Sequence, residues 1–221
     1  MKNNCIYSIY FAGDLFDTKD LLGNAVLAEA INKVSRGKYK CVLPQDLLQD
    51  KMNPKGIRDS DILNLLSSDI AIFNFDGSEL DSGTVVEFMF AKFADIPALQ
   101  LRTDFRNGGD CISDNEHEND EVYPPWNLMA SFYPRTEVLP INSAYEYSLV
   151  KGENSVIRMM QTIENIAKKI VKCLDKLIKH KPILKNNQKK EVCKWLLQMP
   201  NLDLQTKKKL KRAFVKKNNL P

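Results

Sequence analysis

Short apolar segments alternate with helix-like segments through residues 5–145, and this alternation restricts the possible fold more than any other feature of the chain. The apolar segments are rich in β-branched and aromatic residues and are bounded by turn-forming residues, which is typical of strands. They are Cys5–Gly13, Tyr39–Leu43, Asp69–Phe75, Pro97–Leu101 and Thr136–Pro140. The segments between them repeat apolar residues at helical spacing, namely Leu21–Val34, Ile57–Leu66 and Gly83–Ala94.

Strands and helices in this order predict repeated βα units. We therefore expect an α/β fold of the flavodoxin-like or Rossmann-like kind, with a mostly parallel five-stranded sheet, helices on both faces and a C-terminal helical extension. In such sheets ligands bind outside the carboxyl ends of the strands. Tyr10–Phe16, Asp76–Ser82 and Arg102–Arg106 all lie at such ends, so we expect them to surround one crevice.

Charge is distributed unevenly along the chain, whose formal net charge is +4. Residues 1–167 carry 15 basic and 25 acidic side chains, whereas residues 168–221 carry 17 and 3. This asymmetry makes the second part the candidate for contact with an acidic partner. Its lysines occur without interleaved aromatic residues or a recognised motif, so we favour a solvated helical surface over nucleic-acid binding.

The basic part has helical periodicity throughout. Ser155–His180 predicts a long amphipathic helix, and two shorter helical patterns, separated by Pro200-Asn201, predict a small hairpin. We expect a catalytic domain over residues 1–148 and a basic helical extension over residues 149–221.

Several classes of protein are disfavoured by composition. No apolar run approaches the roughly 18 to 20 residues of a membrane-spanning helix, and the first residues lack the pattern of a signal peptide, so a cytoplasmic protein without membrane contact is expected. The five cysteines are odd in number and include no C-x-x-C pair, which argues against disulfides and zinc. We expect no metal and no cofactor.

The segment from Asp81 to Glu87 (DSGTVVE) carries the clearest chemical signal. It puts one carboxylate in a strand-end loop and another in the first turns of a helix, with Ser82 or Thr84 available as the helix cap. The positive end of the helix dipole is expected to favour the ionised form of Glu87. Two carboxylates in different environments suit chemistry at an anomeric carbon. By spacing alone, a cap and a dipole partner explain the same residues.

The surrounding motifs give these carboxylates a context. They are Tyr10-Phe11-Ala12-Gly13, Leu43-Pro44-Gln45, Asp61, Ser68-Asp69, Asp76-Gly77, Asp81-Ser82-Gly83-Thr84, Glu87 and Trp126-Asn127-Leu128-Met129. In this order they resemble the nucleoside 2-deoxyribosyltransferase family over roughly residues 5–145. The D-x-G-T-x-x-E piece is shared with related N-glycoside hydrolases, whereas the N-L-M piece points to the transferases.

The resemblance implies an exchange of the base of 2′-deoxyribonucleosides, with a deoxynucleoside and a free nucleobase as substrates. Glu87 would attack C1′ and form a glycosyl-enzyme ester, and a second base would then restore a nucleoside with retained configuration. Tyr10 would orient Glu87, Asp81 would hold the sugar hydroxyls, and Asp61 would assist proton transfer at the leaving base.

The same resemblance implies the substrate-binding residues. Phe16 would stack on the base and Gln45 would hydrogen-bond its edge, although a core position is an equal alternative for Phe16. Gly83 belongs to the substrate-binding set through its motif. Asn127 would reach into the neighbouring subunit's site, with Met129 lining it, so a homo-oligomer is expected, dimer-based and up to a hexamer.

Three departures from the family pattern and two other functions remain open. The run Phe88–Ala91 replaces the usual small residues, the acidic loop Asp110–Glu121 is unusually charged, and the extension after about residue 150 is only partly covered. One alternative is a deoxynucleoside 5′-monophosphate N-glycosidase, which would need basic residues for its phosphate. The other is a catalytically silent nucleotide- or nucleic-acid-binding protein, which the intact acidic residues disfavour.

Overall fold

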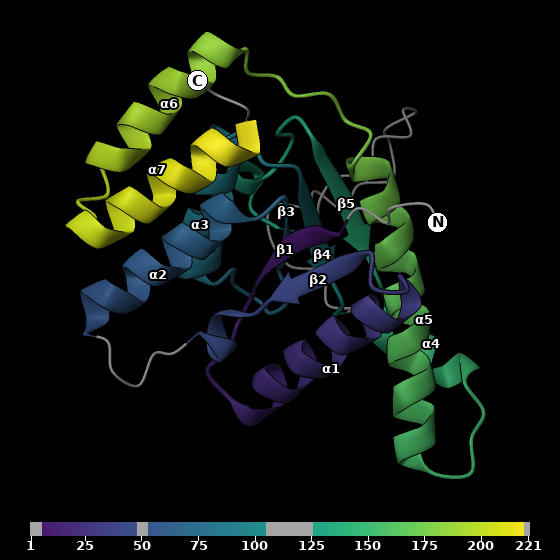
Figure 1. The fold of residues 1–221 in the computed structure, drawn as a ribbon. Helices are drawn as coiled ribbons and strands as arrows, with labels where there is room; N and C mark the ends of the chain where they lie inside the picture. The colour runs from purple at the N-terminus through teal and green to yellow at the C-terminus, as the bar shows by residue number, and fades with distance from the viewer. Residues whose placement is uncertain (1–5, 48–52, 105–125, 219–221) are drawn as a thin grey trace.

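The computed structural model describes residues 6–47, 53–104 and 126–218, and its centre is a five-stranded sheet (Figure 1). The strands are β1 (Tyr7–Ala12), β2 (Tyr39–Val42), β3 (Ile70–Asn74), β4 (Ala98–Arg102) and β5 (Thr136–Pro140). They are arranged in the order β2-β1-β3-β4-β5, and every neighbouring pair is parallel. The expected α/β fold is confirmed, since this is the flavodoxin-like strand order.

The inner strands are apolar because both faces of the sheet are covered. All five residues of β4 are buried, as are the first four of β3 and the last four of β1. Mostly apolar runs of this kind, interrupted in β4 by the buried Gln100 and Arg102, distinguish parallel sheets from the alternating strands of half-exposed antiparallel ones.

Helices form a layer on each face of this sheet. They are α1 (Thr18–Val34), α2 (Pro54–Ser67), α3 (Ser82–Phe93), α4 (Ser143–Leu149), α5 (Ser155–Leu177), α6 (Asn186–Gln198) and α7 (Leu204–Asn218), with short 3₁₀ turns η1 (Pro44–Asp46) and η2 (Leu128–Ala130). Figure 1 shows α1 and α5 on one side of the sheet and α2, α3, α6 and α7 on the other. Helix α4 was not predicted from the sequence, whereas the long amphipathic helix and the C-terminal hairpin were.

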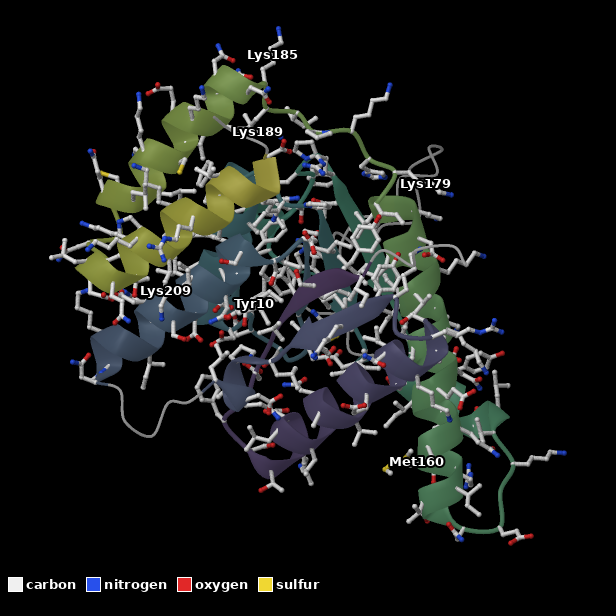
Figure 2. All side chains as sticks on the ribbon, viewed as in Figure 1. Tyr10, Met160, Lys179, Lys185, Lys189 and Lys209 are labelled. Atoms are coloured by element: carbon white, nitrogen blue, oxygen red, sulfur yellow. The ribbon has the colours of Figure 1, made fainter. Side chains whose placement is uncertain are left out.

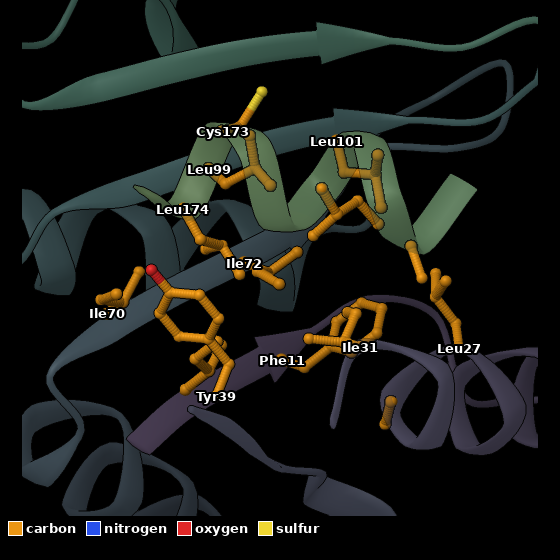
Figure 3. Close-up of a cluster of buried hydrophobic side chains, with 14 of the residues drawn as sticks. Phe11, Leu27, Ile31, Tyr39, Ile70, Ile72, Leu99, Leu101, Cys173 and Leu174 are labelled. Atoms are coloured by element: carbon orange, nitrogen blue, oxygen red, sulfur yellow. The ribbon is translucent and has the colours of Figure 1, made fainter. Parts of the chain in front are cut away.

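The first core lies between the sheet and the helices α1 and α5. Figure 3 shows Phe11, Ile72 and Leu99 from the sheet facing Ile31 of α1 and Leu174 of α5. Helix α5 is strongly amphipathic, and its apolar stripe is what closes this core. The boundary proposed at residue 148 therefore follows the extent of the family resemblance, while α5 shares a core with the sheet.

The second core lies on the opposite face and includes the C-terminal hairpin. Apolar residues of α2, β3 and α3 pack there with four fully or nearly buried side chains of the hairpin region, Leu196, Leu202, Leu210 and Phe214. Tyr10 of β1 belongs to the same cluster, which makes this the face to search for a site.

Element ends follow local hydrogen bonding. Helix α1 begins at Thr18, earlier than the predicted Leu21, because Asp17 Oδ1 accepts hydrogen bonds from the N–H groups of Lys19 and Asp20.

The predicted loop Asn107–Tyr123 lies outside the described residues. Among those that are described, no helix combines the length and apolarity that crossing a membrane requires.

Candidate active site

Tyr10 and Glu87 are joined by a hydrogen bond across the sheet–helix interface. Tyr10 lies in β1, is fully buried, and points toward the layer of α2 and α3 (Figure 2). Its phenolic hydroxyl donates to Oε1 of Glu87 over 2.6 Å. Burial and the nearby Glu87 charge raise the pKa of Tyr10 far above its ordinary range, so the phenol stays protonated and acts as a donor.

The carboxyl of Glu87 is largely withdrawn from water. Burial raises its pKa from 4.5 to about 7; the bond from Tyr10 opposes this shift, while the charges of Asp61 and Asp81 add to it. The expectation that the helix dipole would keep Glu87 ionised is therefore wrong. Glu87 lies in the second turn of α3, beyond the terminal turn where the dipole acts, so desolvation decides its charge.

Asp61 contributes a second buried carboxyl from α2. Burial raises its pKa to about 6, and its charge in turn raises the pKa of both Glu87 and Tyr10. Its Oδ1 is buried and has no hydrogen-bond partner among the described residues. An acid of this kind, held near the nucleophile and without a partner, is available to exchange a proton with a ligand.

Asp81 has a structural role in addition to its place beside Glu87. Its Oδ2 accepts from the N–H of Thr84 over 2.6 Å and from the Thr84 hydroxyl over 2.8 Å, which caps α3. The cap is thus Asp81, as the interpretation from spacing alone had it, and not Ser82 or Thr84. A Cβ on Gly83 would lie 3.1 Å from Asp81 Oδ2, so glycine at this position keeps the carboxylate undisturbed.

Further acidic residues surround the mouth of the site. Burial raises the pKa of Asp14, just after β1, and the charges of Asp81, Asp20 and Asp76 raise it further. Asp14 had no predicted role. It lies within the segment Tyr10–Phe16, which the strand-end argument did assign to the crevice.

The turn after β3 is fixed to the turn after β4. Asp76 accepts from the N–H and hydroxyl of Thr103, each over 2.5 Å, and from the N–H of Asp104 over 3.0 Å. Asp104 accepts from the N–H of Gly77 over 2.7 Å, and the buried Arg102 donates to the Gly77 carbonyl. Such reciprocal bonds hold the strand-end loops in one geometry. An Asp-Gly pair at a strand end was the only sequence signal for them.

The two residues predicted to contact the base lie on loops at the same edge. Phe16 is 78% exposed, which excludes the alternative of a core position. Gln45 lies in η1, after β2, and its Nε2 donates to the Leu21 carbonyl of α1 over 2.8 Å. That bond fixes the Gln45 side chain against α1.

Asn127 and Met129 line a pocket whose lining does not include Glu87. Asn127 Oδ1 accepts from the N–H of Met129 over 2.9 Å and caps η2, and the Met129 side chain is 78% exposed. Both line a pocket of about 700 Å³ with Ser82 and Val86 of α3. Tyr10, Asp61 and Glu87 do not line this pocket, so the structure brings together the four predicted catalytic residues and leaves Asn127 and Met129 on another face of α3.

Within the described residues, no cluster of His, Cys, Asp and Glu side chains is arranged to hold a metal ion. Cys41, Cys173 and Cys193 are free thiols.

A family model described as nucleoside 2-deoxyribosyltransferase matches residues 9–129, which include every predicted site residue. A conserved protein from Enterococcus faecalis V583 is 35% identical, with a TM-score of 0.43 over 48% of this chain and 69% of that chain. A 2-desoxiribosyltransferase from Leishmania mexicana is 22% identical, with a TM-score of 0.44 over 60% of this chain and 89% of that chain. No curated protein matches.

Proposed function

This chain belongs to the nucleoside 2-deoxyribosyltransferase family, and on that premise we propose that it exchanges the base of 2′-deoxyribonucleosides through a glycosyl ester on Glu87. The observation that carries the proposal is the pairing of two buried, electrostatically coupled carboxyls, Glu87 and Asp61, with one phenol donor, Tyr10. We further propose that the exchange serves nucleotide salvage in the cytoplasm, with purines and, where the pocket admits them, pyrimidines.

In the first displacement a carboxylate oxygen of Glu87 attacks C1′ as the bond from C1′ to the base nitrogen breaks. The bonding pair leaves with the base, which needs a proton because a nucleobase anion is a poor leaving group. The hydrogen bond from Tyr10 holds Oε1 of Glu87 and favours its ionised form. The product of this step is an ester between Glu87 and the sugar, with the configuration at C1′ inverted.

Asp61 supplies the proton to the departing base. With pKa values near 6 and 7, the coupled carboxyls hold about one proton between them close to neutral pH. The productive arrangement has that proton on Asp61 and the negative charge on Glu87. In the second displacement an incoming base attacks C1′, its N–H proton passes to Asp61, and Glu87 leaves as a carboxylate. Two inversions give net retention.

The acidic rim favours a nucleoside over a nucleotide. Asp14, Asp76 and Asp81 lie together at the mouth, and each carboxylate would repel a 5′-phosphate. A sugar hydroxyl can instead donate a hydrogen bond to Asp81. This supports transfer between free nucleosides rather than hydrolysis of deoxynucleoside monophosphates.

The substrate pocket is proposed to be completed by a second copy of the chain. Phe16 would stack on the base and Gln45 would bind its edge, while Asn127 and Met129 would enter the neighbouring site. The exposure of Met129, and a pocket lined by Asn127 and Met129 but not by Glu87, support this arrangement. We therefore propose a dimer-based homo-oligomer, up to a hexamer.

The deciding experiment is to incubate the protein with deoxyinosine and adenine and to follow deoxyadenosine by chromatography. The Glu87→Ala variant should lose this activity, and a matched variant of an exposed glutamate, Glu191→Ala on α6, should keep it. A 2′-fluoro-arabinosyl nucleoside should trap the ester, because fluorine at C2′ destabilises the oxocarbenium-like transition state and so slows breakdown of the ester. The trapped ester can then be detected by mass spectrometry. The mass increase should map to Glu87.

Release of hypoxanthine without any new nucleoside would instead identify a hydrolase. Faster turnover of deoxynucleoside monophosphates than of nucleosides would contradict the role given to the acidic rim. Retained exchange in Glu87→Ala would remove Glu87 from the mechanism.

A further inference from the structure

The α6–α7 hairpin is fastened to α2, the helix that carries Asp61. Asp59 of α2 is 1% exposed, and its carboxylate receives hydrogen bonds from Lys55 over 2.7 Å and from Arg58 over 2.5 Å. It also accepts from the backbone N–H of Asp203, over 3.1 Å. Asp203 caps α7 through Gln205 and Thr206, so the beginning of α7 is tied directly to α2.

Two more contacts extend this attachment along α2. Arg58 Nη2 donates to the Pro200 carbonyl, in the turn of the hairpin, over 2.8 Å. At the other end of α2, the ammonium of Lys217 donates to the carbonyl of Ser68, the C-terminal cap residue. Helix α2 is therefore bound to the hairpin both in its first half and at its end.

Apolar packing joins the same two elements. Leu210 and Phe214 of α7 are buried in one cluster with Ile62, Leu65 and Leu66 of α2. The surface of α2 that faces the hairpin is thus partly apolar, and α2 is enclosed between the hairpin and the rest of the second core.

Asp61 depends on this support more than its neighbours do. Successive helix residues are turned by about 100°, so Asp59 and Asp61 point to nearly opposite sides of α2. Glu87 is held by its bond from Tyr10 and Asp81 by its bonds from Thr84, but Asp61 Oδ1 has no partner among the described residues. The position of the Asp61 carboxyl is consequently set by where α2 lies.

We propose that the α6–α7 hairpin is part of the working site, because its contacts with Asp59 and Ser68 hold α2 so that Asp61 faces Glu87. Asp59 is then a positioning residue for proton transfer to the base. The hairpin lies beyond residue 129, where the family match ends, so the role belongs to this chain's own extension. The inference rests on the proposed function for the part that concerns base exchange.

The test compares Asp59→Asn with Asp175→Asn in the full chain. Asp175 accepts from Lys38 over 2.5 Å and from the Tyr39 hydroxyl over 2.8 Å on the opposite face of the sheet, which makes it a half-exposed control for the loss of a carboxylate with several donors. Two experiments are made on each variant: a ¹³C NMR titration of side-chain carboxyls gives the pKa of Asp61, and steady-state kinetics give kcat and KM for base exchange.

In Asp59→Asn the pKa of Asp61 should fall from about 6 toward the ordinary carboxyl value, because a displaced α2 admits water to the group. Its kcat should fall about tenfold to a hundredfold with KM within about twofold, the scale expected for a catalytic group misplaced by about 1 Å. Asp175→Asn should lower the melting temperature without changing either quantity.

Lys217→Met provides an independent variant at the other end of α2, and it removes only one hydrogen bond. It should shift the pKa of Asp61 and kcat in the same direction by a smaller factor. Folded Asp59→Asn and Lys217→Met proteins with an unchanged Asp61 pKa and unchanged kcat would overturn the inference. If the wild-type protein exchanges no bases, the proposed function fails, and the Asp61 titration still decides whether the hairpin positions this residue.

Discussion

The hydroxyl of Tyr10 donates to Oε1 of Glu87 over 2.6 Å, and this bond links β1 to α3, the helix that carries Glu87. It opposes the desolvation that raises the pKa of Glu87 to about 7. Without the phenol, burial and the neighbouring acids would act on the carboxyl unopposed. The readiness of Glu87 to attack at neutral pH therefore depends on Tyr10.

Replacing Tyr10 with Phe should move the acid limb of the kcat/KM profile to higher pH, because the ionised form of Glu87 loses its donor. At pH 7 the activity should fall about tenfold or more, through both the smaller ionised fraction and the lost orientation. Steady-state rates between pH 5 and pH 9 provide the measurement. Tyr39→Phe removes the other buried tyrosine hydroxyl, which binds Asp175, and should leave the profile unchanged.

Activity of the unmodified enzyme should follow a bell-shaped and narrow pH profile. As the pH falls below about 7, Glu87 becomes protonated and loses its nucleophilic charge, and as it rises above about 6, Asp61 loses the proton it donates. The maximum should lie between these values. A rate that rises steadily up to pH 9 would show that Asp61 is not the acid.

Stability should depend on pH in the opposite way to that of a salt-bridged carboxylate. The folded-state pKa of Glu87 lies above its ordinary value. The contribution of Glu87 to the free energy of unfolding is therefore complete below about pH 4.5 and is lost as the pH rises through about 7. At pH 8 the buried, ionised Glu87 destabilises the folded state, so Glu87→Gln should raise the melting temperature there. The gain in the free energy of unfolding should be at most about 1.4 kcal/mol per unit of pKa shift. At pH 4 the same substitution should have little effect, and calorimetry at both pH values compares them.

Mixing two inactive variants should restore activity if sites are shared between subunits. In a hybrid of Glu87→Ala and Asn127→Ala chains, one site combines an intact Glu87 with an intact Asn127 from its neighbour. Co-refolded mixtures should recover base exchange, whereas each variant alone stays inactive. The absence of recovery in a mixture shown to contain hybrids would place Asn127 outside the neighbouring site.

Two glycine substitutions separate a site effect from a helix effect. Gly83→Ala should raise KM for the deoxynucleoside several-fold, because the new Cβ meets Asp81 Oδ2 at 3.1 Å. Gly23→Ala in α1, where a Cβ meets nothing within 4 Å, should leave KM unchanged and stabilise the helix by roughly 0.5 to 1 kcal/mol. Equal kinetics for the two variants would argue against a role for the Asp81 carboxylate in binding the sugar.

The sheet was predictable from sequence because its inner parallel strands are mostly apolar runs bounded by turn residues. β5 was predicted at its observed ends, and β3 and β4 within a residue at either end. Helix α4 escaped prediction because a helix as short as Ser143–Leu149 displays too little periodicity to be recognised. The loop chemistry around Asp76 is set by backbone groups of Thr103 and Asp104 in the turn after β4, which no local pattern reveals.

The charge of Glu87 could not be predicted for a related reason. Local sequence indicates a helix N-terminus, whose dipole favours an anion, but the pKa is set by burial among α2, β1 and Asp61. The hydrogen bonding of Asp59 could not be predicted either, because its partner Asp203 lies 144 residues further along the chain. Sequence predicted which acids gather at the site, and the packing of distant segments decides their protonation and support.

The pairing of β5 with β4, and the cover that α5 gives to the sheet, have a practical consequence for protein engineering. A fragment cut where the family match stops would leave β4 as an open edge strand, and one cut at residue 148 would uncover the apolar face beneath α5. Both fragments should aggregate on expression. Fusions, grafts and minimal catalytic versions of this enzyme should therefore retain the chain through α7, because the α6–α7 hairpin also covers the apolar face of α2.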